Sequence, residues 1–486
     1  MSTHAQTEAR ALRSRLSHPI IDADGHWAEF HPLMRQEFRR IGGDTAVEAL
    51  QMASARIPNS LNMSLRERRR RRIGQEAFWF LPTENTLDRA TAMMPRLLYE
   101  RLDDLGLDFC VIYPTAGLGY YRLPSDTHRR ALCRAYNVYA AEQFRPYGDR
   151  IIPAAIVPMY SPEEAIEELE FASKQLGLRV VMLGSLIRRP IPALVEDHPD
   201  ASKFVEWYDS IGIDSDYDYD PVWAKLRELR IAPSFHNGAR SILLRNSPSN
   251  FCYNHIGHFA SAAEATAKSL FFGGVTRRFP ELNFGFLEGG VGWACSLYAD
   301  LIGHWEKRNR EAVEHYNPAR LDRAQVQSLF EQYGSDRYRE RLDQLDDGLK
   351  MLSLPDEHPA TLDEFARCGI TDVDDIRDVF TRAYHFGCEA DDPMTALAFD
   401  PRRTGGPRLK ALFASDIGHW DVPDIRDVLP EAWELVEDGD ATEADFRALT
   451  FEHAVSLWAA TNPSFFDGTS VEQEVRDELE RVGVPG

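Results

Sequence analysis

The sequence predicts an α/β protein of the (β/α)8 class, the TIM barrel. Three observations favour this fold. Short apolar, β-branched runs alternate with longer helical patterns, and eight such runs follow one another along the chain. An open doubly wound sheet is the runner-up, but it would want a glycine-rich phosphate loop after its first strand. The segment DADGHW, which occupies that place, is not such a loop.

The apolar runs are the expected strands, and helical stretches separate most of them. Residues 161–177 begin with a serine cap, carry glutamate three residues later and end in glycine. Residues 220–230 begin with Asp-Pro, which is a helix-start signal. In chain order the strands are expected at residues 18–24, 107–114, 150–158, 178–185, 230–236, 282–290, 384–392 and 409–416.

Two connections between expected strands are too long for plain loops. They cover residues 27–100 and 300–383, and both are helical and charged in pattern. Each would leave the face where barrel active sites lie, so we expect two long, mainly helical insertions that act as lids on the catalytic face. The first contains the arginine run RERRRRR at residues 66–72. This run fits either a solvated helix face or the recognition of an anionic substrate group.

The composition limits the function classes. The barrel is expected to span residues 18–470, between an N-terminal extension (1–17) and a C-terminal tail (471–486). The 486 residues are 43% hydrophobic and 27% charged, which suits a large core. A net charge of −22 disfavours binding to nucleic acid or to an anionic membrane surface. We therefore expect a small-molecule substrate.

The cysteines and the N-terminus indicate the compartment. The six cysteines are scattered and form no CxxC pair, which is typical of a reducing environment. The first residues lack the apolar region of a Sec signal, and no run of 18 apolar residues occurs. We expect a cytoplasmic protein with no membrane-spanning helix.

Polar side chains end four of the expected strands. The first strand ends in DADGH, where alternation turns Asp22, Asp24 and His26 to one side. Such a group is costly unless it binds a cation, and histidine with aspartate is a usual metal-ligand pair. His236, Glu288 and Asp416 end the fifth, sixth and eighth strands. Each alone has an ordinary explanation: a turn or surface acid, a core histidine bonded to backbone, an ion pair with arginine. Four together on one barrel face are harder to explain structurally.

With these residues in place, the chain resembles the amidohydrolase-related family (amidohydrolase family 2), in the branch that includes aminocarboxymuconate semialdehyde decarboxylase. Asp24-Gly-His26 matches the acid-x-His form of the family's first-strand motif, and Ser415-Asp416 matches its eighth-strand motif. The phrases FPELNFGFLEGGVGW and DVLPEAWELVEDGDATEADFRALTF are similar to the family as well. The resemblance covers roughly residues 18–470, but it is poor over the two insertions.

The resemblance implies one divalent metal ion and a ligand set. Histidines in that set favour zinc, whereas the share of carboxylates favours manganese or iron. A homodimer would fit the family. The implied metal ligands are Asp24, His26, His236 and Asp416.

One departure bears on the reaction. Decarboxylases of the family carry His-Gly-Gly on the sixth strand, and this chain has Glu288-Gly289-Gly290. We therefore predict a metal-dependent hydrolase acting on an amide, ester, lactone or activated C–C bond, with Asp416 or Glu288 as the proton acceptor. Non-oxidative decarboxylation of an aromatic or vinylogous acid is the alternative. A degenerate, non-catalytic metal or ligand binder is the second alternative.

Further residues are candidates for substrate binding. His258 lies in the segment NHIGH after the fifth strand, and His419 follows Asp416 by three residues. Packing and capping are the ordinary explanation of such histidines. Aromatic residues in the first insertion, including Trp27, Phe78, Trp79 and Phe80, accompany the arginine run, and such a mixture suits an organic anion. The expected substrate-binding residues are His258, His419, Glu389 and Trp27.

Overall fold

The computed structural model describes residues 7–77, 79, 81–202, 205–240, 242, 244–350, 361–402 and 406–483. Phe78 and Phe80 lie outside the described residues. The chain divides into two compact units: unit 1 is residues 1–297 with 378–486, and unit 2 is residues 298–377. Within the described residues, no helix combines the length and apolar character needed to cross a bilayer.

All eight predicted strands occur, and the third is divided in two at Ala154. A short antiparallel pair, β6 with β7, was not predicted. The strands are β1 (Ile21–Trp27), β2 (Phe109–Pro114), β3 (Ile151–Pro153), β4 (Ala155–Val157), β5 (Val181–Leu183), β6 (Ile187–Pro190), β7 (Glu206–Asp209), β8 (Pro233–Phe235), β9 (Phe284–Phe286), β10 (Tyr384–Glu389) and β11 (Lys410–Ala414).

The strands that carry the polar ends are parallel. One sheet has the order β1-β2-β3, and a second has the order β4-β5-β8-β9-β10-β11. The two sheets continue into each other along the chain, because Ala154 donates its N–H to Ile112 O of β2 while Ala155 donates to Val180 O before β5. At the other ends of the sheets, Asp416 N donates to Asp24 O over 3.0 Å. Parallel strands place all their carboxyl ends on one side.

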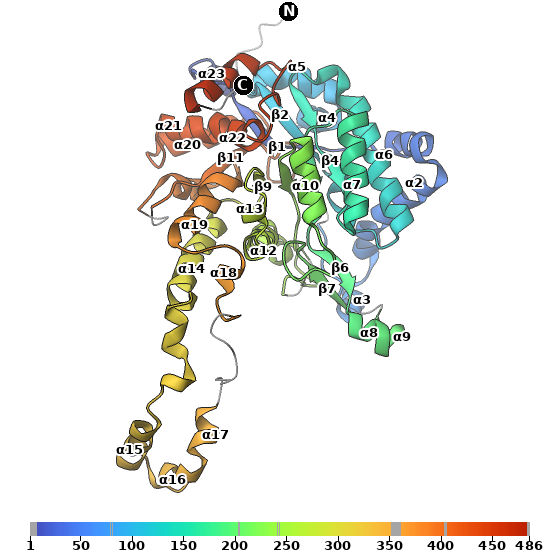
Figure 1. Cartoon of the computed structure of the whole chain (residues 1–486). Helices are drawn as coiled ribbons and strands as arrows, with labels where there is room; N and C mark the ends of the chain where they lie inside the picture. Colours follow the sequence, from blue (N-terminus) through green and yellow to red (C-terminus); the bar gives the residue numbers. More distant parts are fainter. Residues whose placement is uncertain are drawn as a thin grey trace, which may run out of the picture. The chain divides into compact units, whose positions relative to one another are not determined.

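Helices surround these strands, and Figure 1 shows α6, α7 and α10 standing side by side. The helices are α1 (Glu8–Arg13), α2 (His31–Asn62), α3 (Leu65–Arg71), α4 (Thr86–Met93), α5 (Pro95–Leu105), α6 (Asp126–Phe144), α7 (Pro162–Glu170), α8 (Pro192–Asp197), α9 (Pro199–Ser202), α10 (Asp220–Leu229), α11 (Phe251–His255), α12 (His258–Phe272), α13 (Val275–Arg278), α14 (Gly292–Arg308), α15 (Arg323–Tyr333), α16 (Asp336–Arg339), α17 (Leu345–Leu349), α18 (Glu364–Arg367), α19 (Val373–Asp378), α20 (Val428–Glu437), α21 (Glu443–Arg447), α22 (His453–Ala459) and α23 (Glu472–Val482).

The helix signals of the sequence act as expected. The Ser161 hydroxyl accepts the N–H of Glu164, which caps α7. The helix continues through a π-helical turn to Gln175, and Gly177 ends it with a left-handed φ of 71°. Apolar side chains of α7 and α10 turn inward onto the strands, so the core lies between the helices and the parallel sheet.

The connection between β1 and β2 contains α2 to α5. The arginine run forms most of α3, where Arg70 and Arg71 pair with Glu67 at the surface. Arg68 is different: its guanidinium is buried and donates to the carbonyl oxygens of Pro248, Ser60 and Met63. These contacts tie the connection to the loop after β8 and favour the structural interpretation of the run.

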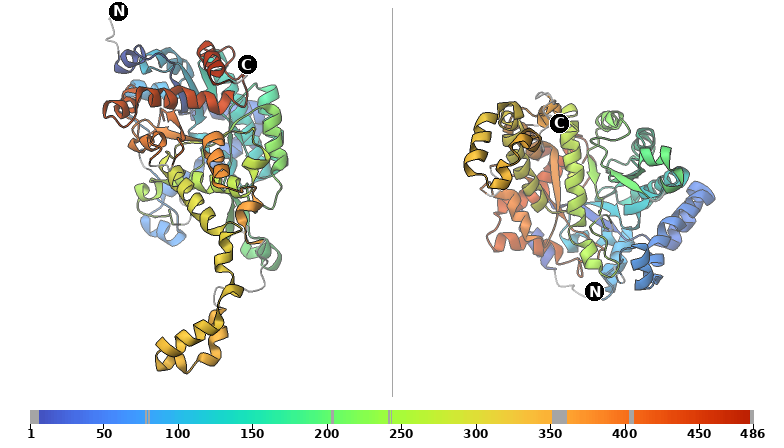
Figure 2. Two further views of the ribbon diagram at one scale, coloured as in Figure 1. Left: turned by 60° about the vertical axis from the view of Figure 1, so that its left-hand side comes forward. Right: turned by 90° about the horizontal axis from the view of Figure 1, so that it is seen from below.

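Unit 2 is helical. It contains the last turns of α14 and then α15 to α18 with most of α19, seen in yellow and orange in Figure 2. None of the residues of α15 or α16 is buried, and Leu345 is the buried residue of α17. The connection between β9 and β10 is therefore mainly helical over its described residues, as the sequence predicted.

Candidate metal centre

Two histidine rings meet at the carboxyl ends of two strands. His26 is near the end of β1, and His236 directly follows β8. Their Nε2 atoms are 3.1 Å apart. Asp24 places Oδ1 3.6 Å from His26 Nε2 and Oδ2 3.4 Å from His236 Nε2. We call Asp24, His26 and His236 the histidine cluster; one ligand atom of each lies within 4.8 Å of the others.

Two further carboxylates and a third imidazole adjoin this cluster. Glu288 Oε2 is 3.3 Å from His236 Nε2, and Asp416 Oδ1 is 3.4 Å from His26 Nε2. The His419 ring stacks on His26 with ring centres 3.8 Å apart and brings Nδ1 within 2.6 Å of Asp416 Oδ1. His26, Glu288, Asp416 and His419 thus form an overlapping group that could hold an ion.

The backbone is strained where the two outer carboxylates arise. Glu288 and Asp416 each lie two residues beyond the last residue of their strand, with φ of 54° and 47°. This left-handed conformation is uncommon for residues other than glycine and persists only where the surroundings impose it. Both strands therefore end in a turn that redirects a carboxylate, as is frequent at functional sites.

Asp22 supports the site without entering the cluster. Its Oδ1 accepts the N–H groups of Asp24 and Ser415, and its Oδ2 accepts the Ser415 hydroxyl over 2.6 Å. The register of β1 against β2 shifts between Asp22 and Gly25. A side chain at Gly25 would lie 2.7 Å from Asp22 Oδ2, so glycine is needed there. The carboxylate thus joins β1 to the end of β11.

Burial opposes charge on His26, Glu288 and Asp416. Burial and the neighbouring His419 and His236 lower the pKa of His26. Burial and nearby carboxylates, Glu389 first, raise the pKa of Glu288 well above its usual range. The pKa of Asp416 rises for the same reasons, with Glu288 as the largest neighbouring charge. Neutral histidines beside carboxylates are the ligand set that a divalent cation stabilises.

The donors themselves fit a metal ion. Asp24 Oδ1 and Glu288 Oε2 are buried and make no hydrogen bond among the described residues. The facing Nε2 atoms of His26 and His236 can share at most one proton between them. The adjacent carboxylate oxygens, Asp24 Oδ1, Asp24 Oδ2 and Glu288 Oε2, therefore have few hydrogen-bond donors to balance their negative charge. A bound cation would satisfy all of them at once.

A second set of acids lies on the other side of Glu288. We call Glu288, Glu389 and Asp421 the acidic group; one carboxylate oxygen of each lies within 4.8 Å of the others. Glu389 ends β10, and burial with the neighbouring Asp421 raises its pKa to about 8. Sequence reasoning missed Asp421. Its only signal was its place in DIGHWD, five residues after Asp416.

Basic residues lie beside the histidine cluster: Arg240 in the loop after β8, His258 at the start of α12 and Arg122 in the turn after β2. His258 is 4% exposed, and neither ring nitrogen makes a hydrogen bond within the described part of the chain. Burial, His255 and then Arg240 and Arg122 lower its pKa. A side chain at Gly238 would lie 2.4 Å from the His258 ring, so glycine allows this approach. The two arginines were not predicted.

Trp27 is placed away from the cluster, so the structure does not bring it together with the other predicted site residues. Its ring stacks on Tyr139 with centres 5.0 Å apart and lies against Phe144, and its indole N–H donates to Met93 O. Because neighbours along a strand point to opposite faces, His26 faces the cluster and Trp27 faces the helices. Trp79, another predicted aromatic, is 96% exposed.

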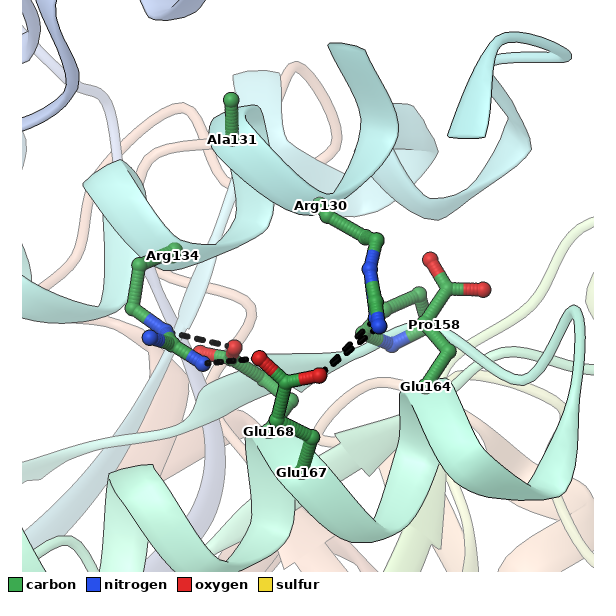
Figure 3. Close-up of a pocket in the computed structure, with 7 residues that line it drawn as sticks. All are labelled: Arg130, Ala131, Arg134, Pro158, Glu164, Glu167 and Glu168. Atoms are coloured by element: carbon green, nitrogen blue, oxygen red, sulfur yellow. Dashed lines mark hydrogen bonds and ion pairs between the residues drawn. The ribbon is translucent and has the colours of Figure 1, made fainter. Parts of the chain in front are cut away.

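A cavity lies between α6 and α7, far in sequence from the residues of the histidine cluster. Arg130 and Arg134 line one side and Glu167 with Glu168 the other, and ion pairs cross between them (Figure 3). Its charged side chains are already paired with one another, so we interpret it as helix packing.

Comparisons with known proteins identify a family and several similar structures. Residues 21–338 match a family model described as amidohydrolase. The fold is similar to an amidohydrolase from Mycobacterium avium subsp. paratuberculosis K-10 (16% identity, TM-score 0.50, 91% of this chain and 98% of that chain). It is also similar to 2,6-dihydroxybenzoate decarboxylase from Rhizobium (15%, 0.47, 91% and 98%) and to 5-carboxyvanillate decarboxylase from Sphingomonas paucimobilis (14%, 0.46, 91% and 99%). No curated protein matches the sequence.

Proposed function

The chain belongs to the amidohydrolase family of enzymes, and from that premise we propose that it is a metal-dependent hydrolase of a small organic substrate. The histidine cluster is the observation that carries this proposal. It joins the ends of β1 and β8 through contacts of 3.1–3.6 Å among buried side chains, and Asp24 Oδ1 makes no hydrogen bond within the described part of the chain.

We further infer that the parallel strands close into one eight-stranded barrel. The hydrogen bond from Asp416 N to Asp24 O and the bonds of Asp22 to Ser415 support closure between β11 and β1. The two helical connections would then be insertions on the catalytic face. For the first, the bonds between residues 68–76 and the loop after β8 support that position.

In this proposal Asp24, His26, His236 and Asp416 hold one divalent ion. Zinc suits the histidines, and manganese or iron suits the carboxylates. When bound, such an ion polarises a substrate carbonyl and lowers the pKa of water. A homodimer, which the family resemblance favours, stays a prediction.

Glu288 and Asp416 have different roles in this proposal. Glu288 Oε2 is 3.3 Å from His236 Nε2 and receives no hydrogen bond among the described residues. A cation bound beside it would offset the burial that raises its pKa, and the carboxylate would then accept a proton from attacking water and return it to the leaving atom. Asp416 is held by His419 at 2.6 Å, which fixes the carboxylate beside His26. Asp22 keeps the two strand ends in register with each other.

The proposal about the substrate rests on His258 and the basic residues near it. The ring nitrogens of His258, which make no hydrogen bond among the described residues, offer a hydrogen bond to a polar group. Of the two arginines near it, Arg240 pairs with Glu76 at 3.0 Å and Arg122 donates to Gly238 O. His258 therefore supports a substrate that carries a carboxylate or another polar group away from the bond that is cut. His419 and Glu389 were predicted to bind substrate. His419 contacts the proposed metal ligand Asp416, and Glu389 belongs to the acidic group, so in this proposal both residues support the metal site.

Decarboxylation is the second candidate, and one observation favours it. Burial and neighbouring acids raise the pKa of Glu288, and a carboxyl group that holds its proton could protonate a ring carbon. The two reactions differ in product. A panel of amides, esters, lactones and aromatic acids, scored for both hydrolysis and carbon dioxide, separates them.

The test of the proposal uses purified protein loaded in turn with zinc, manganese and iron. We expect hydrolysis of at least one neutral carbonyl substrate, dependent on metal. Carbon dioxide release from an aromatic acid, with no hydrolysis in the panel, would replace the hydrolase by the decarboxylase. A chain that binds metal firmly and turns over nothing would favour the non-catalytic binder.

A further inference from the structure

Helix α15 of unit 2 carries an exposed apolar face. Val326, Leu329, Phe330 and Tyr333 are spaced at i, i+3, i+4 and i+7, so they form one stripe along the helix. Leu329 is 46% exposed and Tyr333 is 74% exposed, and none of the residues of α15 is buried. A stripe with this spacing is typical of a helix that packs against a neighbour, and the described part of the chain buries no residue of it.

Two further apolar residues extend this face beyond the ends of the helix. Leu321 directly precedes the N-cap residue Asp322 and is 50% exposed. Tyr338 lies in α16 and is 59% exposed, and its ring centre is 5.7 Å from that of Phe330. The six residues that we call the α15 stripe are Leu321, Val326, Leu329, Phe330, Tyr333 and Tyr338.

The size of the α15 stripe bears on what could cover it. Its leucine and tyrosine side chains expose apolar surface on the order of 400 Å² per chain. With the polar side chains beside them, the pairing of two such surfaces would bury about 1,000 Å² in total, the size of a weak but specific interface. The helix has 11 residues, and helices shorter than about 12–15 residues are marginal in water without a packed face. Covering the stripe would therefore stabilise α15 itself.

The apolar residues of the stripe are complementary to themselves in the reverse direction. We consider two antiparallel copies of α15 related by a two-fold axis that passes between Leu329 and Phe330. Val326 of one copy is then opposite Tyr333 of the other copy. Beyond the helix ends, the residues that come opposite each other are Leu321 and Tyr338. Apolar side chains thus meet apolar side chains along the whole stripe, as a two-fold interface between identical chains requires.

The charged residues around α15 match in the same register. Asp322 of one copy is opposite Arg337 of the other, and Arg323 is opposite Asp336. Arg323 already pairs with Asp346 within its own chain, whereas Arg337 makes no ion pair among the described residues. Antiparallel helices also bring opposite ends of the two helix dipoles together. A parallel pair would instead place each of these charges beside its own kind, so the charges favour the antiparallel pair.

We propose that the α15 stripe is the contact surface between two copies of this chain, which pair antiparallel through α15. The pairing covers the exposed leucines and tyrosines and brings Asp322 to Arg337. All residues of the stripe belong to unit 2, whereas the histidine cluster and the acidic group belong to unit 1. The inference therefore goes beyond the proposed function and does not depend on it.

The experiment measures the mass of the full-length protein in solution by light scattering over a range of concentrations. Wild type should have twice the mass of one chain at high concentration and approach one chain on dilution. Leu329→Glu and Tyr333→Glu place a charge in the stripe and should have the mass of one chain throughout. Ser328→Glu adds the same charge on the opposite side of α15 and should behave like wild type. Circular dichroism confirms that each variant is folded.

Cysteine cross-linking tests the direction of the pairing. Under mild oxidation, a mixture of Val326→Cys and Tyr333→Cys should form a disulfide-linked dimer. Val326→Cys alone should cross-link no more than wild type, which controls for the native cysteines. A wild type with the mass of one chain at every concentration overturns the proposal. Dimers that persist in both glutamate variants of the stripe overturn it as well, and efficient cross-linking of Val326→Cys alone overturns the antiparallel arrangement.

Discussion

The histidine cluster and the acidic group lie side by side but differ in burial and in chemistry. Asp24, His26 and His236 are at most 2% exposed and arise within or directly after β1 and β8. Glu389 and Asp421 are partly exposed and arise at or beyond strand ends. Rigid, mixed nitrogen and oxygen donors suit a resident transition metal, whereas open carboxylates suit an exchangeable hard cation. The contrast indicates that the histidine cluster is the better place for a tightly held ion.

The largest effect is expected from the histidine cluster. His236→Ala removes one of its two imidazoles, so the protein should lose its tightly held metal and its turnover while the chain stays folded. Elemental analysis and circular dichroism measure the two outcomes. His255→Ala, a histidine of α11 outside the cluster, is the matched control and should keep the metal. Equal metal content in both variants would show that the cluster is not the site.

Glu288→Gln tests the carboxylate between the two regions. If Glu288 Oε2 accepts the proton from water, the amide removes the base at nearly constant shape, and kcat for hydrolysis should fall by about 100-fold or more. Steady-state kinetics on the metal-loaded enzyme measure it. A variant that keeps full hydrolytic activity would move the proton acceptor to Asp416.

Asp22→Ala probes the support of the histidine cluster. The change leaves the N–H groups of Asp24 and Ser415 and the Ser415 hydroxyl without their acceptor. Buried donors without partners cost about 1–3 kcal/mol each, so with three such donors we expect the free energy of unfolding to drop by at least about 3 kcal/mol. Denaturant titration measures it, with Ser415→Ala as the milder control. An unchanged free energy would mean that Asp22 does not join the strand ends.

A smaller effect is expected from His18, a buried histidine outside the metal centre, on the pH dependence of the free energy of unfolding. His18 bonds to Thr450 through Nε2, and burial, with Arg447 and Arg13, lowers its pKa to about 4. The unfolded chain takes up this proton below about pH 6.5 and the folded chain only below about 4, so stability contributed by neutral His18 is lost as pH falls through that window. Wild type should therefore lose more stability than His18→Gln between pH 7 and 4.5, whether metal is present or absent. Parallel pH profiles of unfolding would contradict this assignment.

Sequence reasoning located the strands and the histidine cluster because both depend on local pattern. Apolar runs identify strands, and a polar residue at the end of such a run is visible in a single sequence, as with His236 and Asp416. Asp421 and Arg240 lie in loops, where no periodicity reports direction, so their approach to the site is a tertiary effect. Trp27 shows what such patterns leave out: it was a candidate because aromatic residues accompany the arginine run, and strand alternation, which decides where its side chain lies, turns it toward the helices instead of toward His26.

The most direct test of the account is the metal content of the purified wild-type chain compared with that of His236→Ala. We predict at least one tightly bound zinc, manganese or iron ion per chain in wild type after dialysis, and a loss of that ion in the variant with the fold retained. A wild-type protein that stays metal-free when zinc, manganese and iron are each supplied would contradict the account.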